Sequence, residues 1–409
     1  MIDAIHAKYG EYDLKLFDAL DNLQFYVLPL NGFDLTDELY VKMNARGKPL
    51  TGFENFKADL FKWLKSQENK TNKFSSQVQY HGRSLKYHFV LELKFDIDWT
   101  GLFWEYSKSF EKQDDKLVDI YFHHFINRYL LNRYILESKT SFSDLEANDV
   151  FRSLYNLEKV DKNLTYNSFD NYEIVFQLNP EEITVGLEKV LDGLRGNLAA
   201  VNELSKSNWG SQDWTIFNTS ISQRQRIVLL AISSYLERNT FDRDMFKDWM
   251  RIVWNIIIDP NLRSVPAMAT AMTYISELSS KSDDILSHMA NSDLLLFEND
   301  NTYEIQLEEE YLKARLIKQN EQWKEELIIA ERHKLFQGKI RFLLTEETQE
   351  NIDLFKKYRD TAMSIFEGND LTDKPENYLW IRALLSKCVE LEIDKKGLDL
   401  SYGNFNNWR

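Results

Sequence analysis

The stretch from Asp115 to Glu137, Asp-Lys-Leu-Val-Asp-Ile-Tyr-Phe-His-His-Phe-Ile-Asn-Arg-Tyr-Leu-Leu-Asn-Arg-Tyr-Ile-Leu-Glu, decides the fold class. Apolar and aromatic side chains recur in it every three or four residues, which places them on one face of an α-helix. That face consists of Val118, Tyr121, Phe122, Phe125, Ile126 and Tyr129. The stretch therefore predicts one long amphipathic helix.

Similar spacing continues on both sides of this stretch. Gly (14) and Pro (6) are scarce, and many short strands joined by tight turns would need more of both. The spacing predicts helices near residues 144–157, 180–196, 222–238, 242–258, 264–279, 307–318, 321–333, 348–367 and 376–387. Leu23 to Leu30, Leu-Gln-Phe-Tyr-Val-Leu-Pro-Leu, is the best candidate for a strand. The predicted fold is mainly α, multi-helical with a small β element near residues 23–30.

The length of the chain allows more than one domain. Its 409 residues suffice for two or three domains of about 100–200 residues each. Polar stretches near residue 70 and between Asn291 and Thr302 separate groups of predicted helices. We expect an N-terminal part over residues 1–70, a helical subdomain over 71–290 and a C-terminal helical subdomain over 291–409.

Charge and cysteine content narrow the class of protein. The net charge is −15, whereas proteins that coat nucleic acid non-specifically are usually basic, so any nucleic-acid contact must be local. Cys388 is the only cysteine, which excludes an internal disulfide and a cysteine-based metal cluster and fits a reducing compartment. The first residues do not resemble a signal peptide, and no run of about 18 uncharged apolar residues occurs. We expect a cytoplasmic protein with no membrane partner.

One short region is basic within this acidic chain. Residues 42–65 carry six basic side chains against two acidic ones, a local charge of +4. Asn44, Arg46 and Lys48 belong to a Gly-containing loop before a helix, where free N–H groups and the helix dipole favour an anion. Together with Lys57 they form the candidate site for a phosphate of a nucleotide or nucleic acid. The alternative is a helix–loop–helix corner in which Arg46 pairs with a core carboxylate.

The helix after this loop begins with the pattern of a capping box. Thr51 can accept a hydrogen bond from one backbone N–H, and Glu54 can reach back to another. We therefore assign Thr51 and Glu54 a structural role. Lys57 lies near the apolar face of the same helix, so we expect it either to extend along that face to solvent or to reach a ligand held by Arg46.

Other clusters of reactive side chains favour structural roles. His123 and His124 are adjacent on a helix and point about 100° apart, so we predict no metal site there. Glu331 and His333 do not face each other on one helix, and His333 is interpreted as a helix cap or as a charge that interacts favourably with the helix dipole. The acidic run Glu308–Glu310 is interpreted as a solvated face or as charges near a helix N-terminus.

Two tryptophan pairs have the same spacing. Trp99 and Trp104, like Trp249 and Trp254, are separated by five positions. Packing between helices explains these pairs better than a platform on which nucleic-acid bases stack.

Four parts of the chain carry a resemblance to a known family. The most specific is Leu39–Lys57, which contains Asn-Ala-Arg-Gly and Phe-Glu-Asn-Phe-Lys, and the others are Asp98–Trp104, Trp249–Asn255, and Glu309–Ala314 with Glu331–Ile340. The first part is similar to the Asn-x-Arg-Gly and Phe-Glu-x-x-Lys elements of GmrSD-type restriction and phage-defence proteins. The resemblance implies that residues 1–70 are the remnant of a ParB-like domain. For the full family it implies nucleotide-driven recognition and cleavage of foreign DNA, with a divalent metal.

Both catalytic motifs of that family are absent from this sequence. It contains no Asp-Gly-Gln-Gln-Arg, and none of its seven histidines is followed by Pro three residues later. We therefore expect the middle and helical portion of a truncated, split or degenerate family member that is not an active enzyme alone. Its nucleotide and metal are unknown, and DNA would bind through the local basic patch. The alternative function is a non-catalytic helical scaffold that binds a partner protein or the missing N-terminal half.

Overall fold

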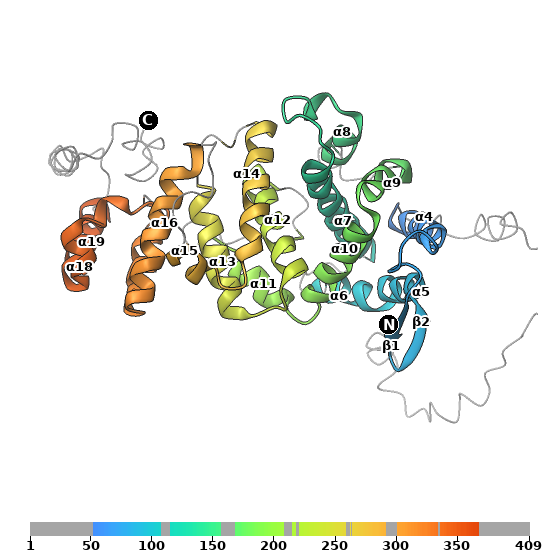
Figure 1. Ribbon diagram of the computed structural model, residues 1–409, viewed down its shortest axis with the longest axis horizontal. Helices are drawn as coiled ribbons and strands as arrows, with labels where there is room; N and C mark the ends of the chain where they lie inside the picture. Colours follow the sequence, from blue (N-terminus) through green and yellow to red (C-terminus); the bar gives the residue numbers. More distant parts are fainter. Residues whose placement is uncertain are drawn as a thin grey trace, which may run out of the picture. The chain divides into compact units, whose positions relative to one another are not determined.

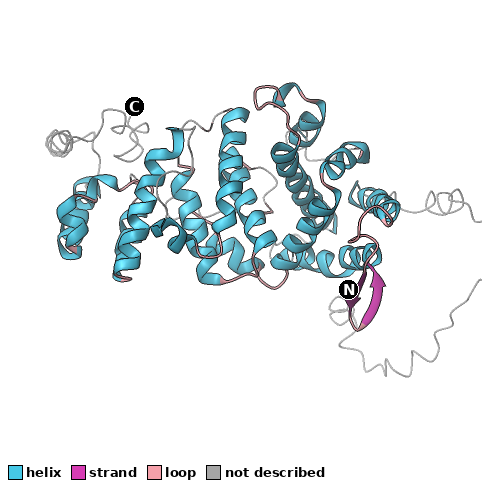
Figure 2. Ribbon diagram, in the orientation of Figure 1, coloured by secondary structure: helices cyan, strands magenta, loops and turns pink. Residues whose placement is uncertain are grey.

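The computed structural model describes residues 52–107, 115–156, 168–207, 215–217, 221–258, 262, 264–291, 301–333 and 336–367. Within these ranges the chain is mainly helical and contains one two-stranded sheet, which confirms the predicted fold class (Figure 1, Figure 2). The strand predicted near residues 23–30 and the helix predicted near 376–387 lie outside the described residues.

The elements follow one another along the chain. The first group is α4 (Gly52–Gln67), β1 (Gln77–Tyr80), β2 (Arg83–Lys86), α5 (Tyr87–Leu93), the π-helix η1 (Lys94–Asp98), α6 (Trp99–Ser107), α7 (Asp115–Glu137), η2 (Leu145–Ala147) and α8 (Asp149–Asn156). The second is α9 (Phe169–Leu178), α10 (Pro180–Leu194), α11 (Leu198–Leu204), α12 (Gln223–Arg238), α13 (Arg243–Ile256), α14 (Val265–Leu278) and η3 (Ser279–Lys281). The third is α15 (Ile285–Asn291), α16 (Asn301–Gln319), α17 (Gln322–Glu331), η4 (Arg341–Leu343), α18 (Glu346–Glu350) and α19 (Ile352–Glu367).

Helix α7 has the bounds that its apolar spacing predicts. Three of the residues assigned to its buried face, Phe125, Ile126 and Tyr129, are each only 1% exposed. The side chains of Val118, Tyr121 and Phe122, the other members of that face, are not among those that the structure describes. Every residue from His124 to Ile135 is buried, so this part of the helix is enclosed on all sides and not on the predicted apolar face alone.

The sheet is a short hairpin that was not predicted from the sequence. Strand β1 pairs antiparallel with β2, with Val78 opposite Leu85. His81 and Gly82 both have positive φ, at 46° and 75°, as the two central residues of a tight hairpin turn require. The flanking strands are polar and only partly buried, so the sequence carries little alternation by which to recognise them.

Helix α12 is buried along most of its length. It contacts α7, α10, α13 and α14, and every residue from Arg226 to Leu236 is buried. Its start is fixed by a capping box, in which Ser222 accepts a hydrogen bond from the Gln225 N–H and the Gln225 side chain accepts from the Ser222 N–H. The helices predicted near 222–238, 242–258 and 264–279 are confirmed as α12, α13 and α14.

The tryptophan pairs take part in helix packing, as predicted. Trp249 is fully buried, and its indole N–H donates to the carbonyl of Ala231 in α12 at 3.0 Å. Trp99 is also fully buried and donates to Asp192 of α10 at 3.0 Å. Both hydrogen bonds join helices that are distant in sequence.

Helices α13, α16 and α17 form the part of the fold that positions the site described below. Helix α16 contacts both α13 and α17. It also contacts α15, the helix that precedes it in the chain (Figure 1). The predicted divisions at residues 70 and 290 stay predictions. None of the described helices is both long and apolar enough to cross a lipid bilayer.

Candidate functional site

A stripe of polar side chains runs along one face of α13. It consists of Asp244, Lys247, Asp248, Arg251 and Asn255. The last four lie three, four, seven and eleven positions after Asp244, which places all five on one side of the helix. Its first two members are exposed, whereas Asp248 is 9%, Arg251 4% and Asn255 1% exposed. The stripe therefore leads from the surface into the interior.

Local sequence fixes where this helix begins. Asp242 caps α13 by accepting hydrogen bonds from the N–H groups of Asp244 and Met245 at 3.0 and 2.9 Å. The remaining face of α13 carries Phe246 and Trp249, which are fully buried. Burial of that apolar face sets the rotation of the helix and so directs the polar stripe toward α16 and α17.

The inner end of the stripe holds a buried ion pair. Arg251 Nε and Nη2 donate to the two carboxylate oxygens of Glu331 at 2.8 and 2.7 Å, which is the bidentate arrangement. Both side chains are nearly inaccessible, with 3% and 0% exposure. Asn255 Nδ2 lies 3.0 Å from a carboxylate oxygen of Glu331 and 3.0 Å from one of Glu310.

Lys313 of α16 lies in the middle of these acids. Its ammonium is 2.7 Å from Glu309 and 2.7 Å from Glu310. It is 3.0 Å from Glu331 and donates to the carbonyl of Gly338 at 2.7 Å. We call the following six residues the inner network: Arg251, Asn255, Glu309, Glu310, Lys313 and Glu331.

The chain after α17 closes the inner network. Glu309 accepts hydrogen bonds from the backbone N–H groups of Ile340 and Arg341 at 2.8 and 3.1 Å. Gly338 has a φ of +87°, and a Cβ built on it would lie 2.3 Å from Asn255 Oδ1. This position therefore requires glycine both for its backbone conformation and for the close approach of Asn255.

The two central carboxyls of the inner network have opposite pKa shifts. Burial raises the pKa of Glu331, but the charges of Arg251 and Lys313 and their hydrogen bonds outweigh burial and hold this pKa below its ordinary value. Burial also raises the pKa of Glu310, and Lys313 and Arg251 do not offset it. Among the described residues, no donor reaches Glu310 Oε2. Of these two carboxyls, Glu310 is therefore the one whose neutral form the surroundings favour.

The inner network corrects one sequence interpretation. Glu309 and Glu310 were expected on a solvated face, but each is only 1% exposed, so that expectation was wrong for both. They are buried because Lys313 on the same helix and the N–H groups after α17 satisfy them. The His333 ring lies 4.3 Å from that of Phe336.

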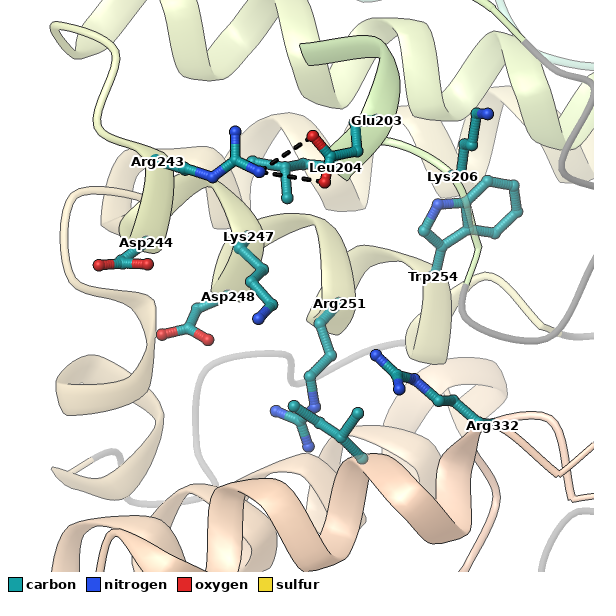
Figure 3. A pocket seen from close by; sticks show the side chains of 11 residues that line it. Glu203, Leu204, Lys206, Arg243, Asp244, Lys247, Asp248, Arg251, Trp254 and Arg332 are labelled. Atoms are coloured by element: carbon teal, nitrogen blue, oxygen red, sulfur yellow. Dashed lines mark hydrogen bonds and ion pairs between the residues drawn. The ribbon is translucent and has the colours of Figure 1, made fainter. Parts of the chain in front are cut away.

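The outer end of the stripe opens into a pocket of about 270 Å³, which we call the outer pocket (Figure 3). The end of α11, the stripe of α13 and the end of α17 form its walls, with Leu204, Trp254 and Ile328 as apolar members. Its basic side chains are Lys206, Arg243, Lys247, Arg251 and Arg332, and its acidic ones are Glu203, Asp244 and Asp248. The lining is therefore net positive in a protein whose net charge is −15.

Pairing within the outer pocket leaves an excess of cations. Arg243 Nη2 donates to both oxygens of Glu203 at 2.9 and 3.0 Å, and Lys324 pairs with Asp248 at 2.7 Å. Lys206, Lys247 and Arg332 have no ion pair or side-chain hydrogen bond with the part of the chain that the structure describes. Figure 3 shows the Lys247 and Arg332 side chains extending into the pocket from α13 and from the end of α17.

The site predicted from sequence is described only in part. Asn44, Arg46, Lys48 and Thr51 lie outside the described residues, so neither the phosphate site nor the capping box is tested. Lys57 of α4 is 2.7 Å from Asp96.

The other α4 candidate, Glu54, is exposed in the first turn. The Lys57 ammonium lies 5.3 Å from the centre of the Phe53 ring, and its side chain is 19% exposed. Its stem thus follows an apolar surface while its charge meets a partly exposed acid.

The described residues also contain no cluster of three or more histidine, cysteine or acidic side chains able to hold a metal. His124 is 7% exposed. Burial, together with the charges of Arg128 and Arg226, lowers the pKa of His124 to about 4. The imidazole is therefore neutral near neutral pH.

No protein-family model, curated protein or solved structure matches the chain. The GmrSD-type resemblance therefore rests on the sequence segments alone. The outer pocket was missed by sequence reasoning, although the helical spacing of polar residues in α13 was a signal for it. Such a stripe is usually a solvated face, and only the fold shows that α16 and α17 cover its inner end.

Proposed function

We propose that the chain is the helical portion of a GmrSD-like restriction or anti-phage defence protein, located in the cytoplasm. In this proposal it binds DNA through Asn44, Arg46, Lys48 and Lys57 and does not cleave DNA by itself. Nucleotide hydrolysis and cleavage would be supplied by a further part or partner of the system.

One observation carries the proposal. Two of the four parts on which the resemblance rests, Trp249–Asn255 and Glu309–Ala314 with Glu331–Ile340, meet in the inner network. Chance matches scattered along a chain have no reason to contact one another. Segments that share a buried set of ion pairs do have a reason to occur together, because removing one partner leaves a buried charge unpaired.

The position of Lys57 is compatible with a phosphate contact. Its ion pair with Asp96 is partly exposed, since the Asp96 side chain is 54% exposed. Exposed ion pairs contribute at most about 1 kcal/mol, so a phosphate can replace this partner at small cost.

The test is binding of a fluorescent DNA duplex to the purified full chain at several salt concentrations. We expect salt-dependent binding that becomes at least about tenfold weaker in the double variant Arg46→Ala with Lys48→Ala. Lys62→Ala is the matched control, because Lys62 is exposed in the same basic region but outside the motif. Unchanged binding in the double variant would contradict the phosphate site, and DNA cleavage or nucleotide hydrolysis by the pure chain would contradict the non-catalytic role.

The alternative is a helical scaffold for a partner protein. It is favoured by two large apolar side chains on α5 and η1, since Phe89 is 52% and Ile97 61% exposed. Exposed apolar side chains that gather into one contiguous patch mark a surface that a partner covers. A monodisperse monomer that binds no apolar dye would count against this alternative.

A further inference from the structure

We infer that the outer pocket is a phosphate-binding site, for inorganic phosphate or for the phosphate of a small hydroxylated ester. The inference is independent of the proposed function, because it concerns a different part of the chain and a ligand other than DNA. Four features carry it: excess positive charge, a buried donor without a partner, a buried acceptor without a partner, and the size of the pocket.

The positive charge is available for a ligand. Lys206, Lys247 and Arg332 line the pocket and have no ion-pair partner in the described ranges. Of the three acids that line the pocket, Asp244 alone has no ion pair with a basic side chain in the described part of the chain, and it is exposed. Two of the cations come from different helices and reach into the same space (Figure 3), so an anion there contacts them together.

Arg251 supplies a donor that the fold leaves unused. Its side chain is 3% exposed, and Glu331 occupies Nε and Nη2. Nη1 is buried and has no hydrogen-bond partner among the described residues. A buried donor without a partner costs free energy, and the bidentate pair with Glu331 holds the guanidinium rigidly at the wall of the pocket. An oxyanion that reaches Nη1 from the pocket removes that cost.

Asp248 supplies the complementary acceptor. Lys324 engages its Oδ2 at 2.7 Å, while its Oδ1 is buried without a hydrogen-bond partner in the same part of the chain. A carboxylate beside an anion is repulsive unless the anion donates a proton to it. Inorganic phosphate carries at least one O–H near neutral pH and a sugar phosphate carries hydroxyls, whereas sulfate carries none. Asp248 therefore selects phosphate over sulfate.

The pocket also limits the size of the ligand. Its volume of about 270 Å³ is slightly below the roughly 300–1,000 Å³ of pockets that enclose drug-sized molecules. This favours a phosphate or a small phosphorylated molecule over an extended nucleic-acid strand.

The experiment is calorimetric titration of the full chain in a chloride buffer with inorganic phosphate, ribose 5-phosphate and sulfate in turn. We expect saturable binding at one site for one or both phosphates, and at least about tenfold weaker binding of sulfate. Lys247→Ala and Arg332→Ala should each weaken phosphate binding by about tenfold, since each removes a hydrogen bond to a charged group. Both residues are exposed, so these variants are expected to fold.

Two control variants separate the site from general charge effects. Lys357→Ala removes an exposed lysine of α19 away from the pocket and should leave binding unchanged. Asp248→Asn should bring phosphate and sulfate to within about threefold of each other, whereas Lys324→Gln, which keeps the Asp248 carboxylate, should preserve the preference.

Several results would overturn the inference. These are the absence of saturable phosphate binding, equal affinity for sulfate, or the same loss in Lys357→Ala as in Lys247→Ala. Binding of a DNA oligonucleotide that depends on Lys247 and Arg332, without binding of either small phosphate, would also overturn it in favour of a nucleic-acid surface. None of these results bears on Arg46, so the proposed function is tested separately.

Discussion

Two arginines join helices in this protein, and they do so in different surroundings. Arg133 of α7 forms ion pairs with Glu137, with Glu182 of α10 at 3.0 Å and with Glu237 of α12 at 3.2 Å. Tyr129 also donates to Glu237, at 2.8 Å. We call these five residues the Arg133 network.

Arg251, by contrast, gives two nitrogens to one acid and leaves the third without a partner in the described residues.

Exposure separates the two networks further. The acids around Arg133 are 16%, 20% and 65% exposed, whereas the ionised side chains of the inner network are at most 3% exposed. Water and salt weaken an exposed pair, while a buried pair must satisfy its own charges. The Arg133 network is therefore suited to fastening helices, and the inner network also holds Arg251 in place for the outer pocket.

The largest expected effect is that of Glu331→Gln. The change removes the charge that faces both Arg251 and Lys313 and leaves these two buried cations short of a counter-charge. We expect the free energy of unfolding to fall by about 3–5 kcal/mol, as measured by urea denaturation at pH 7. Glu308→Gln is the control, because Glu308 lies on α16 but does not belong to the inner network, and it is only partly buried. A loss below about 1 kcal/mol would mean that the inner network is hydrated in solution.

Glu237→Gln is the corresponding change in the Arg133 network. Glutamine keeps an oxygen that can accept from Tyr129, and Arg133 keeps its other acids. We expect a smaller loss, of about 1.5 kcal/mol, which is the lower end for a hydrogen bond to a charged group. Denaturation under the same conditions gives the comparison directly. If this variant lost as much as Glu331→Gln, exposure would not be what distinguishes the two networks.

Glu310→Gln tests the pKa assignment within the inner network. The folded protein holds the pKa of Glu310 above its ordinary value of 4.5, so between these two pKa values the folded state binds more protons than the unfolded one. The Glu310 contribution to stability is therefore present at low pH and is lost as pH rises through the folded pKa. The variant should lose less stability than the native protein when pH is raised from about 4.5 to 7. A steeper loss in the variant would reverse the assignment of the two acids.

Much of the fold could be predicted from the sequence, because local spacing determines it. Helix α7 has the bounds predicted for it, and α12 to α14 begin at or beside polar caps. Helix α16 begins six residues before the predicted start at 307. The hairpin of β1 and β2 was missed because its strands are short and largely polar.

The candidate site could not be predicted in the same way. Arg251, Glu310 and Glu331 lie on three helices, and no spacing within one helix indicates which charges meet across an interface. Only the pairings of Lys313 with Glu309 and Glu310, four and three residues apart on α16, have a local signal. The charged run was interpreted as solvated because its remaining partners come from α13 and from the chain after α17.

The smallest effect is expected for Glu182→Gln, at the rim of the Arg133 network. The Glu182 side chain is 65% exposed, and it lies in the first turn of α10, where it also accepts from Asn179 at 2.6 Å. Loss of an exposed pair and of a charge near a helix N-terminus should together reduce the free energy of unfolding by at most about 0.5–1 kcal/mol. High salt should shrink the difference further, because the ions screen exposed charges. A loss equal to that of Glu237→Gln and insensitive to salt would show that the rim is as closed to water as the inner network, and the contrast between the two arginines would then fail.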